Sequence, residues 1–169
     1  MIHNVLQHLD LENCQDQESI KDQIRDMILQ GKVEDAIFEM INLQRVIDFA
    51  QHPVTQRLRS SKNAYKEQQF VLLMDAGEII TSFQEDYQEE IMVQGVIDCF
   101  FEEEDGYTLV DYKTDYVPEG HGRGEAIERI KQQYAKQIEI YARAIEDITK
   151  NIVKEKYLYL YSANKWVKM

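Results

Sequence analysis

Three charged residues, Asp98, Asp111 and Lys113, interrupt two stretches that otherwise favour buried β-strands. Two carboxylates on neighbouring strands repel each other, and a divalent cation that prefers oxygen ligands would remove the repulsion. A lysine beside them is suited to stabilise charge that develops on a phosphorus centre, or to orient a water nucleophile. The alternative is a surface ion pair of Asp98 and Lys113 with Asp111 solvated. The apolar neighbours of all three residues favour the metal site.

The two stretches predict a β-hairpin. Residues 96–101 and 107–112 are rich in β-branched and aromatic side chains, and the sequence E-D-G at 104–106 predicts a tight turn between them. If residues 105 and 106 form the turn, Asp98 lies opposite the lysine; if residues 104 and 105 form it, Asp98 lies opposite Asp111. Both registers place the three charges on one face, because side chains alternate with a period of two.

The pattern G-V-I-D, a dozen residues, then V-D-Y-K-T-D resembles the active-site motif of the PD-(D/E)XK nucleases. More narrowly, it resembles the RecB-type exonuclease domain found at the C-terminus of bacterial recombination helicase-nucleases. The resemblance implies a restriction-endonuclease-like fold in which Asp98, Asp111 and Lys113 are the catalytic residues. Ile97 replaces the proline that usually precedes the first acid.

Residues near the N-terminus extend the resemblance. His3 and Gln7 lie four apart on an expected helix, and the segment H-N-V-L-Q resembles one that bears a histidine in this family. The resemblance makes His3 a metal ligand and Gln7 a supporting residue, although the family's preceding glycine-threonine pair is absent. Glu67 matches an acid that precedes a short strand, and it too would be supporting. Taken alone, a histidine near a terminus would be interpreted as incidental.

A helix after the hairpin carries the family's Q-x-x-x-Y signature, here Gln137 and Tyr141. The spacing lets both side chains reach one point, and the resemblance assigns them to positioning the DNA strand. Without the hairpin, Tyr141 would be interpreted as a core aromatic and Gln137 as a partly buried amide. The resemblance also makes the backbone carbonyl of Tyr112 a metal ligand.

Composition predicts one soluble domain over residues 1–169, with 44% hydrophobic and 30% charged residues. No apolar run is long enough for a membrane span, and the N-terminus does not resemble a signal peptide. Two cysteines provide neither a disulfide framework nor an iron-sulfur cluster, which agrees with a reducing cytoplasm. No G-x-x-x-x-G-K-[ST] loop occurs, so no ATP site is expected in this chain.

The net charge of −12 argues against a domain that captures DNA unaided, because such proteins neutralise phosphates with Lys and Arg. A small basic cluster at 56–62 is expected to be a solvated helix end rather than a DNA contact. We therefore expect a fragment of a larger machine, to which a helicase motor delivers the strand. A chain that begins inside a helix agrees with that expectation.

The pattern of elements predicts an α/β fold, with a central mixed sheet flanked by helices and a helical N-terminal part. The expected elements are a helix from residue 1 to 10, helices over 16–30 and 33–49, a short helix from Pro53, a strand at 65–74, an acidic loop at 85–90, the hairpin, a mobile loop at 117–124, a helix at 125–150, a strand at 153–161 and an edge strand near Trp166.

These features together predict a Mg²⁺-dependent deoxyribonuclease that hydrolyses phosphodiester bonds of single-stranded DNA. Asp98 and Asp111 would hold the ion with His3 and the Tyr112 carbonyl, and Mn²⁺ would be a plausible substitute. One metal or two stays open. The rivals are a non-catalytic DNA-binding or interaction module that kept the fold, and a small-molecule phosphohydrolase; the second lacks a glycine loop to cradle phosphate.

Overall fold

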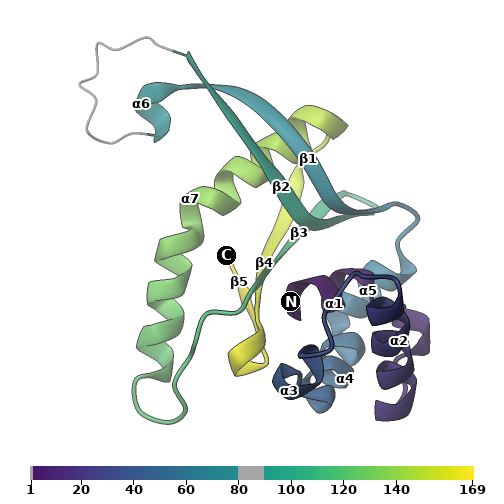
Figure 1. Ribbon diagram of the computed structural model, residues 1–169. Coiled ribbons are helices and arrows are strands. Elements are labelled where there is room, and N and C mark those ends of the chain that lie inside the picture. Colours follow the sequence, from purple (N-terminus) through teal and green to yellow (C-terminus); the bar gives the residue numbers. More distant parts are fainter. Residues whose placement is uncertain (1, 80–89) are drawn as a thin grey trace.

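A five-stranded mixed sheet forms the centre of the structure, a computed structural model that describes residues 2–79 and 90–169 (Figure 1). The strand order is β1-β2-β3-β4-β5, in which β3 and β4 are parallel and all other neighbours antiparallel. The strands are β1 (Ala64–Asp75), β2 (Glu90–Glu103), β3 (Gly106–Lys113), β4 (Val153–Leu160) and β5 (Lys165–Lys168). The acidic loop expected at 85–90 lies outside the described residues except for Glu90.

Helices cover both faces of this sheet, so the predicted fold class is confirmed (Figure 1). The helices are α1 (Ile2–His8), α2 (Gln17–Leu29), α3 (Ile37–Met40), α4 (Leu43–Gln51), α5 (Pro53–Ser60), α6 (Ala76–Ile79) and α7 (Arg123–Thr149), with short 3-10 turns η1 (Leu11–Asn13) and η2 (Tyr161–Ala163). The N-terminal helices pack on one face and α7 on the other.

The alternation along β4 explains this two-sided burial. Tyr159 is buried among the residues of α1, α2, α4 and α5, whereas Leu158 and Leu160 are buried among those of α7. Successive side chains of a strand point to opposite faces, so each strand supplies both cores. The sheet is therefore enclosed in the region from which the charged residues of the hairpin must emerge.

The N-terminal helices largely follow their predicted boundaries. Asp16 caps α2 through a capping box with Ser19, and Gly31 follows its end at a φ of 70°. The single helix expected over 33–49 is wrong, because the chain forms α3 and α4 with a break between them. Ile41 is extended there, and the Asn42 side chain accepts a hydrogen bond from the Arg45 amide to start α4 anew.

The hairpin adopts the second of the two predicted registers. Glu103 pairs with Gly106, so residues 104 and 105 form the turn. Gly106 has a φ of 144°, and a Cβ there would lie 2.7 Å from the Ile152 carbonyl oxygen, which excludes larger residues. Counting back along both strands, this register sets Asp98 opposite Asp111.

Helix α7 crosses the sheet between the parallel strands β3 and β4, as parallel neighbours require. It begins two residues before its predicted start, after Gly122, whose φ is 87°. In the preceding loop, Val117 is buried and its amide donates to Ser162 Oγ. This connection carries the middle of α7 past the end of β3, where Lys113 lies.

Candidate active site

Strands β2 and β3 separate at the proposed catalytic residues. Their ladder ends at the pair Cys99 and Val110, and at the next step the Tyr112 amide donates to Asp98 Oδ2 at 2.8 Å instead of to a backbone carbonyl. The Asp98 carboxylate thus occupies the opening between the strands. Asp98 and Asp111 are both buried, at 8% and 1% exposure. The register brings together two carboxylates that the sequence separates by a dozen residues.

His3 reaches this opening from α1. Its Nε2 lies 2.8 Å from Asp98 Oδ2, and its ring meets the Tyr112 ring edge-on at 5.6 Å between centroids. Asp98 Oδ2 is therefore contacted by both the His3 ring and the Tyr112 amide. The structure places His3 beside the first carboxylate, where the resemblance predicted a metal-side residue.

Asp111 is a buried carboxylate that the described residues leave without a hydrogen bond in good geometry. Lys113 Nζ lies 2.6 Å from its Oδ2 as an ion pair. Burial, followed by the charge of Asp98, raises the pKa of Asp111 to about 7, although Lys113 opposes the rise. A buried pair of carboxylates that is so poorly compensated fits a divalent cation, which would supply the missing charge and take the free oxygens as ligands.

The remaining ligands of such a cation would come largely from elsewhere than acidic side chains. Within residues 2–79 and 90–169, no three His, Cys, Asp or Glu side chains are gathered as a metal ligand set. Mg²⁺ usually keeps several waters and binds through one or two carboxylates plus phosphate oxygens. The residues present therefore fit Mg²⁺ better than a metal that needs a full protein cage.

Lys113 connects the carboxylates to α7. Its Nζ donates to Gln137 Oε1 at 3.0 Å, and Gln137 Nε2 donates to the Tyr141 hydroxyl at 2.9 Å. Burial, then Asp111, raises the pKa of Tyr141, so its hydroxyl stays protonated. The two residues of the Q-x-x-x-Y signature thus form one chain of contacts with Lys113 and Asp111. The structure brings them to the site, as their predicted role requires.

Two supporting residues lie less close to the chemistry. Gln7 is buried, and its side-chain amide has no hydrogen bond to any described residue, while its backbone carbonyl accepts a hydrogen bond from Lys66 Nζ at 2.6 Å. Glu67 is exposed and interrupts β1 opposite Asp98, with a φ of 51° that non-glycine residues rarely adopt. Their supporting roles stay predictions, because the described contacts join neither side chain to the carboxylates.

Tyr134 and Asp115 are neighbours of Lys113 that the sequence did not single out. Lys113 Nζ lies 4.2 Å from the centroid of the Tyr134 ring, and the Tyr134 hydroxyl donates to the two oxygens of Asp115 at 3.2 and 3.0 Å. Tyr134 precedes Gln137 by three residues, so both share one side of α7. That spacing was the signal available in the sequence, where Tyr134 belongs to an apolar stripe.

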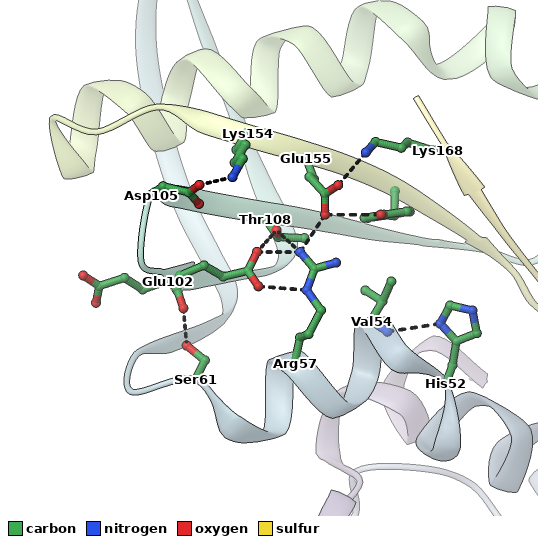
Figure 2. A network of polar contacts seen from close by, with 12 residues as sticks. His52, Val54, Arg57, Ser61, Glu102, Asp105, Thr108, Lys154, Glu155 and Lys168 are labelled. Atoms are coloured by element: carbon green, nitrogen blue, oxygen red, sulfur yellow. Dashed lines mark hydrogen bonds and ion pairs between the residues drawn. The ribbon is translucent and has the colours of Figure 1, made fainter.

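The basic cluster at 56–62 is neither a solvated helix end nor a free cationic surface. Arg57 lies between Glu103 and Glu155, as Figure 2 shows, and Arg59 pairs with Glu12. In the loop before α7, the guanidinium of Arg123 donates to the Ala163 carbonyl at 2.8 Å. These arginines are used inside the fold, which agrees with a domain that does not capture DNA by charge alone.

Comparison with known proteins gives a consistent set of relatives, each of them the AddA component of an ATP-dependent helicase/nuclease. The chain is 44% identical to that of Thermoanaerobacter sp. (strain X514) over 161 residues, which are 95% of this chain and 13% of the relative. It is 36% identical over 169 residues to that of Alkaliphilus oremlandii, and 39% over 171 to that of Clostridium botulinum (strain Hall), in both cases 100% of this chain.

The chain thus spans only 13–14% of the length of these relatives. No family model matches it. No helix in the described ranges is both long and apolar enough to cross a membrane.

Proposed function

The chain belongs to the AddA family of ATP-dependent helicase/nucleases as one segment of such a protein, and we propose that this segment is the metal-dependent nuclease module. The observation that carries the proposal is the buried Asp111, which is held beside Asp98 and Lys113 without a hydrogen bond in good geometry. An arrangement so costly for stability is expected where a ligand or a reaction needs it.

The proposed reaction is hydrolysis of a DNA phosphodiester bond, in which a water oxygen attacks phosphorus and a P–O bond to the leaving nucleotide breaks. Asp98 and Asp111 would hold Mg²⁺, with Mn²⁺ as a substitute, and His3 and the Tyr112 carbonyl would complete the protein ligands. Bound there, the ion would supply charge to the phosphate and activate water. No iron-sulfur cluster and no ATP site are part of this proposal.

The remaining residues of the site act on the substrate and on the water. Lys113, 13% exposed at its side chain, is positioned to orient the attacking water or to stabilise the negative charge that develops on the phosphate. Gln137 and Tyr141 would orient the scissile strand, because they end the chain of contacts that starts at Asp111. The hydrogen bond that Gln137 donates to Tyr141 keeps the two side chains together.

The substrate and partners follow from the relatives and from the charge. We infer that the module acts as an exonuclease on single strands during double-strand-break repair by recombination, in the cytoplasm and away from membranes. With a net charge of −12, it would receive its strand from the helicase motor in the rest of AddA, which works with an AddB-like protein.

The test is cleavage of end-labelled single-stranded DNA by the chain, with Mg²⁺ and with chelator. Mg²⁺-dependent release of nucleotides, lost in Asp98→Asn, would support the proposal. A matched control is Asp105→Asn, which changes an aspartate of the same hairpin that pairs with Lys154 on the surface. Cleavage that survives Asp98→Asn, or that is absent from the parent at high protein concentration, would favour the non-catalytic module instead.

A further inference from the structure

We infer that Tyr134 is a positioning residue of the proposed nuclease site, whose aromatic face holds the Lys113 ammonium in place. This inference rests on the proposed function and adds a residue to it. Lys113 is carried at the very end of β3, on a flexible four-carbon stem with many accessible rotamers. A reaction that depends on the place of one ammonium needs contacts that remove that freedom.

Three contacts of different kinds surround the Lys113 ammonium. Asp111 Oδ2 lies 2.6 Å away, Gln137 Oε1 lies 3.0 Å away, and the centroid of the Tyr134 ring lies 4.2 Å away. The negative face of an aromatic ring attracts a cation at this distance, and the attraction grows where water is excluded. The ring therefore covers a side of the ammonium that the two oxygen atoms leave free.

The Tyr134 ring is itself fixed at its far end. Its hydroxyl donates to the carboxylate of Asp115, and burial followed by Asp115 raises the pKa of Tyr134, so the phenol keeps its proton. The backbone carbonyl of Asp115 accepts a hydrogen bond from Ser162 Oγ, at the end of β4. The ring is thus held between α7 and the segment that follows Lys113, an arrangement that bulk packing alone would not require.

An experiment on the 169-residue chain separates the ring from the hydroxyl. In Tyr134→Phe the ring stays and the bond to Asp115 is lost; in Tyr134→Leu both are lost. We expect kcat on single-stranded DNA to fall about tenfold in Tyr134→Leu with KM changed less than about twofold, the scale of a partly desolvated cation–π contact. Tyr134→Phe should restore most of the parent kcat.

The matched control is Tyr157→Leu. Tyr157 also donates its hydroxyl to a carboxylate, that of Glu155, and also lies under a lysine, with Lys168 Nζ 5.8 Å from its ring centroid. It lies in the other charge cluster of the sheet, so its loss tests a purely structural role. We expect Tyr157→Leu to lower the melting temperature about as much as Tyr134→Leu and to leave kcat unchanged.

A second readout does not depend on cleavage. Protons near the end of the Lys113 side chain should show an upfield ring-current shift in NMR spectra of the parent and of Tyr134→Phe, and lose it in Tyr134→Leu. A folded Tyr134→Leu with the kcat of the parent, or a parent spectrum without the shift, would overturn the inference while the nuclease proposal stands. A parent without Mg²⁺-dependent cleavage would overturn both.

Discussion

Two clusters of charge lie at opposite ends of the β2–β3 hairpin, and they are resolved in opposite ways. Near the turn, the Arg57 cluster consists of Arg57, Glu103, Thr108, Glu155 and Lys168 (Figure 2). Arg57 donates to both oxygens of Glu103 at 2.8 and 2.5 Å and to Glu155 at 2.6 Å. At the other end, Asp98 and Asp111 lie close together with Lys113 as the only cation paired with Asp111 among the described residues.

The pKa values of the two clusters differ in direction for this reason. Hydrogen bonds from Lys168 and Arg57 lower the pKa of Glu155 to about 2, and Arg57 likewise lowers that of Glu103. Burial and Asp98 raise the pKa of Asp111 to about 7. Acids whose charged forms are favoured contribute to stability, whereas a buried acid whose charged form is disfavoured lowers it. The contrast indicates a structural cluster at the turn and a functional one at the open end.

The largest effect is expected from Asp111→Asn. The amide keeps the shape but removes a proposed metal ligand, so cleavage of single-stranded DNA should fall by more than about 10³-fold, beyond the loss typical of one charge-stabilising donor. Metal binding, followed by calorimetry with Ca²⁺ or Mn²⁺, should disappear as well. The free energy of unfolding without metal should not fall, because a disfavoured charge is removed. A variant that cuts DNA at the parent rate would place the chemistry elsewhere.

Lys113→Ala should have a smaller but still large effect on the same reaction. Loss of the ammonium should lower kcat by about 10² to 10³-fold, since one group that stabilises developing charge is missing. Both carboxylates remain, so the calorimetric affinity for the metal should survive. The pair of variants thus separates ligand from charge stabiliser, and an equal loss of metal binding in both would contradict these assignments.

Arg57→Met tests the structural cluster. It leaves Glu103 and Glu155 without their main partner, which should lower the free energy of unfolding by about 2 kcal/mol, a value reduced for the partial exposure of these groups. Urea unfolding at pH 7 measures it. Its control, Arg59→Met, breaks an exposed pair with Glu12 and should change stability by less than about 0.5 kcal/mol. Should kcat of the folded Arg57→Met fall as far as in Lys113→Ala, the two clusters would not be separate in function.

The smallest effect is expected in acid. The pKa of Glu155 is lowered on folding, so its contribution to stability is complete above the unfolded value near 4.5 and is lost as the pH falls towards 2. Urea unfolding of the parent at a series of pH values should show about 1 kcal/mol of this loss. Glu155→Gln should remove that part of the pH dependence. An unchanged slope would mean that solvent already screens the cluster.

Prediction from sequence reached the elements better than the contacts between them. The strands on either side of the turn, the long helix and the edge strand at Trp166 are confirmed, because alternation and helical periodicity are local properties. The break at Ile41 and Asn42 was missed, since a cap within an apolar pattern depends on one side-chain hydrogen bond. Gln7 and Glu67 matched a family pattern, yet the described contacts do not join their side chains to the carboxylates.

The sequence by itself determined that two acids and a lysine would share one face of a hairpin, because a period of two holds in any register. Which acid faces which residue depended on a shift of one position in the turn, and the fold decided it through Gly106, packed against the Ile152 carbonyl. The contacts of Lys113 with Gln137 and Tyr134 were likewise decided by tertiary structure. They join a strand to a helix whose position over the sheet is set by the crossover to β4 and by burial on both faces, which no local pattern encodes.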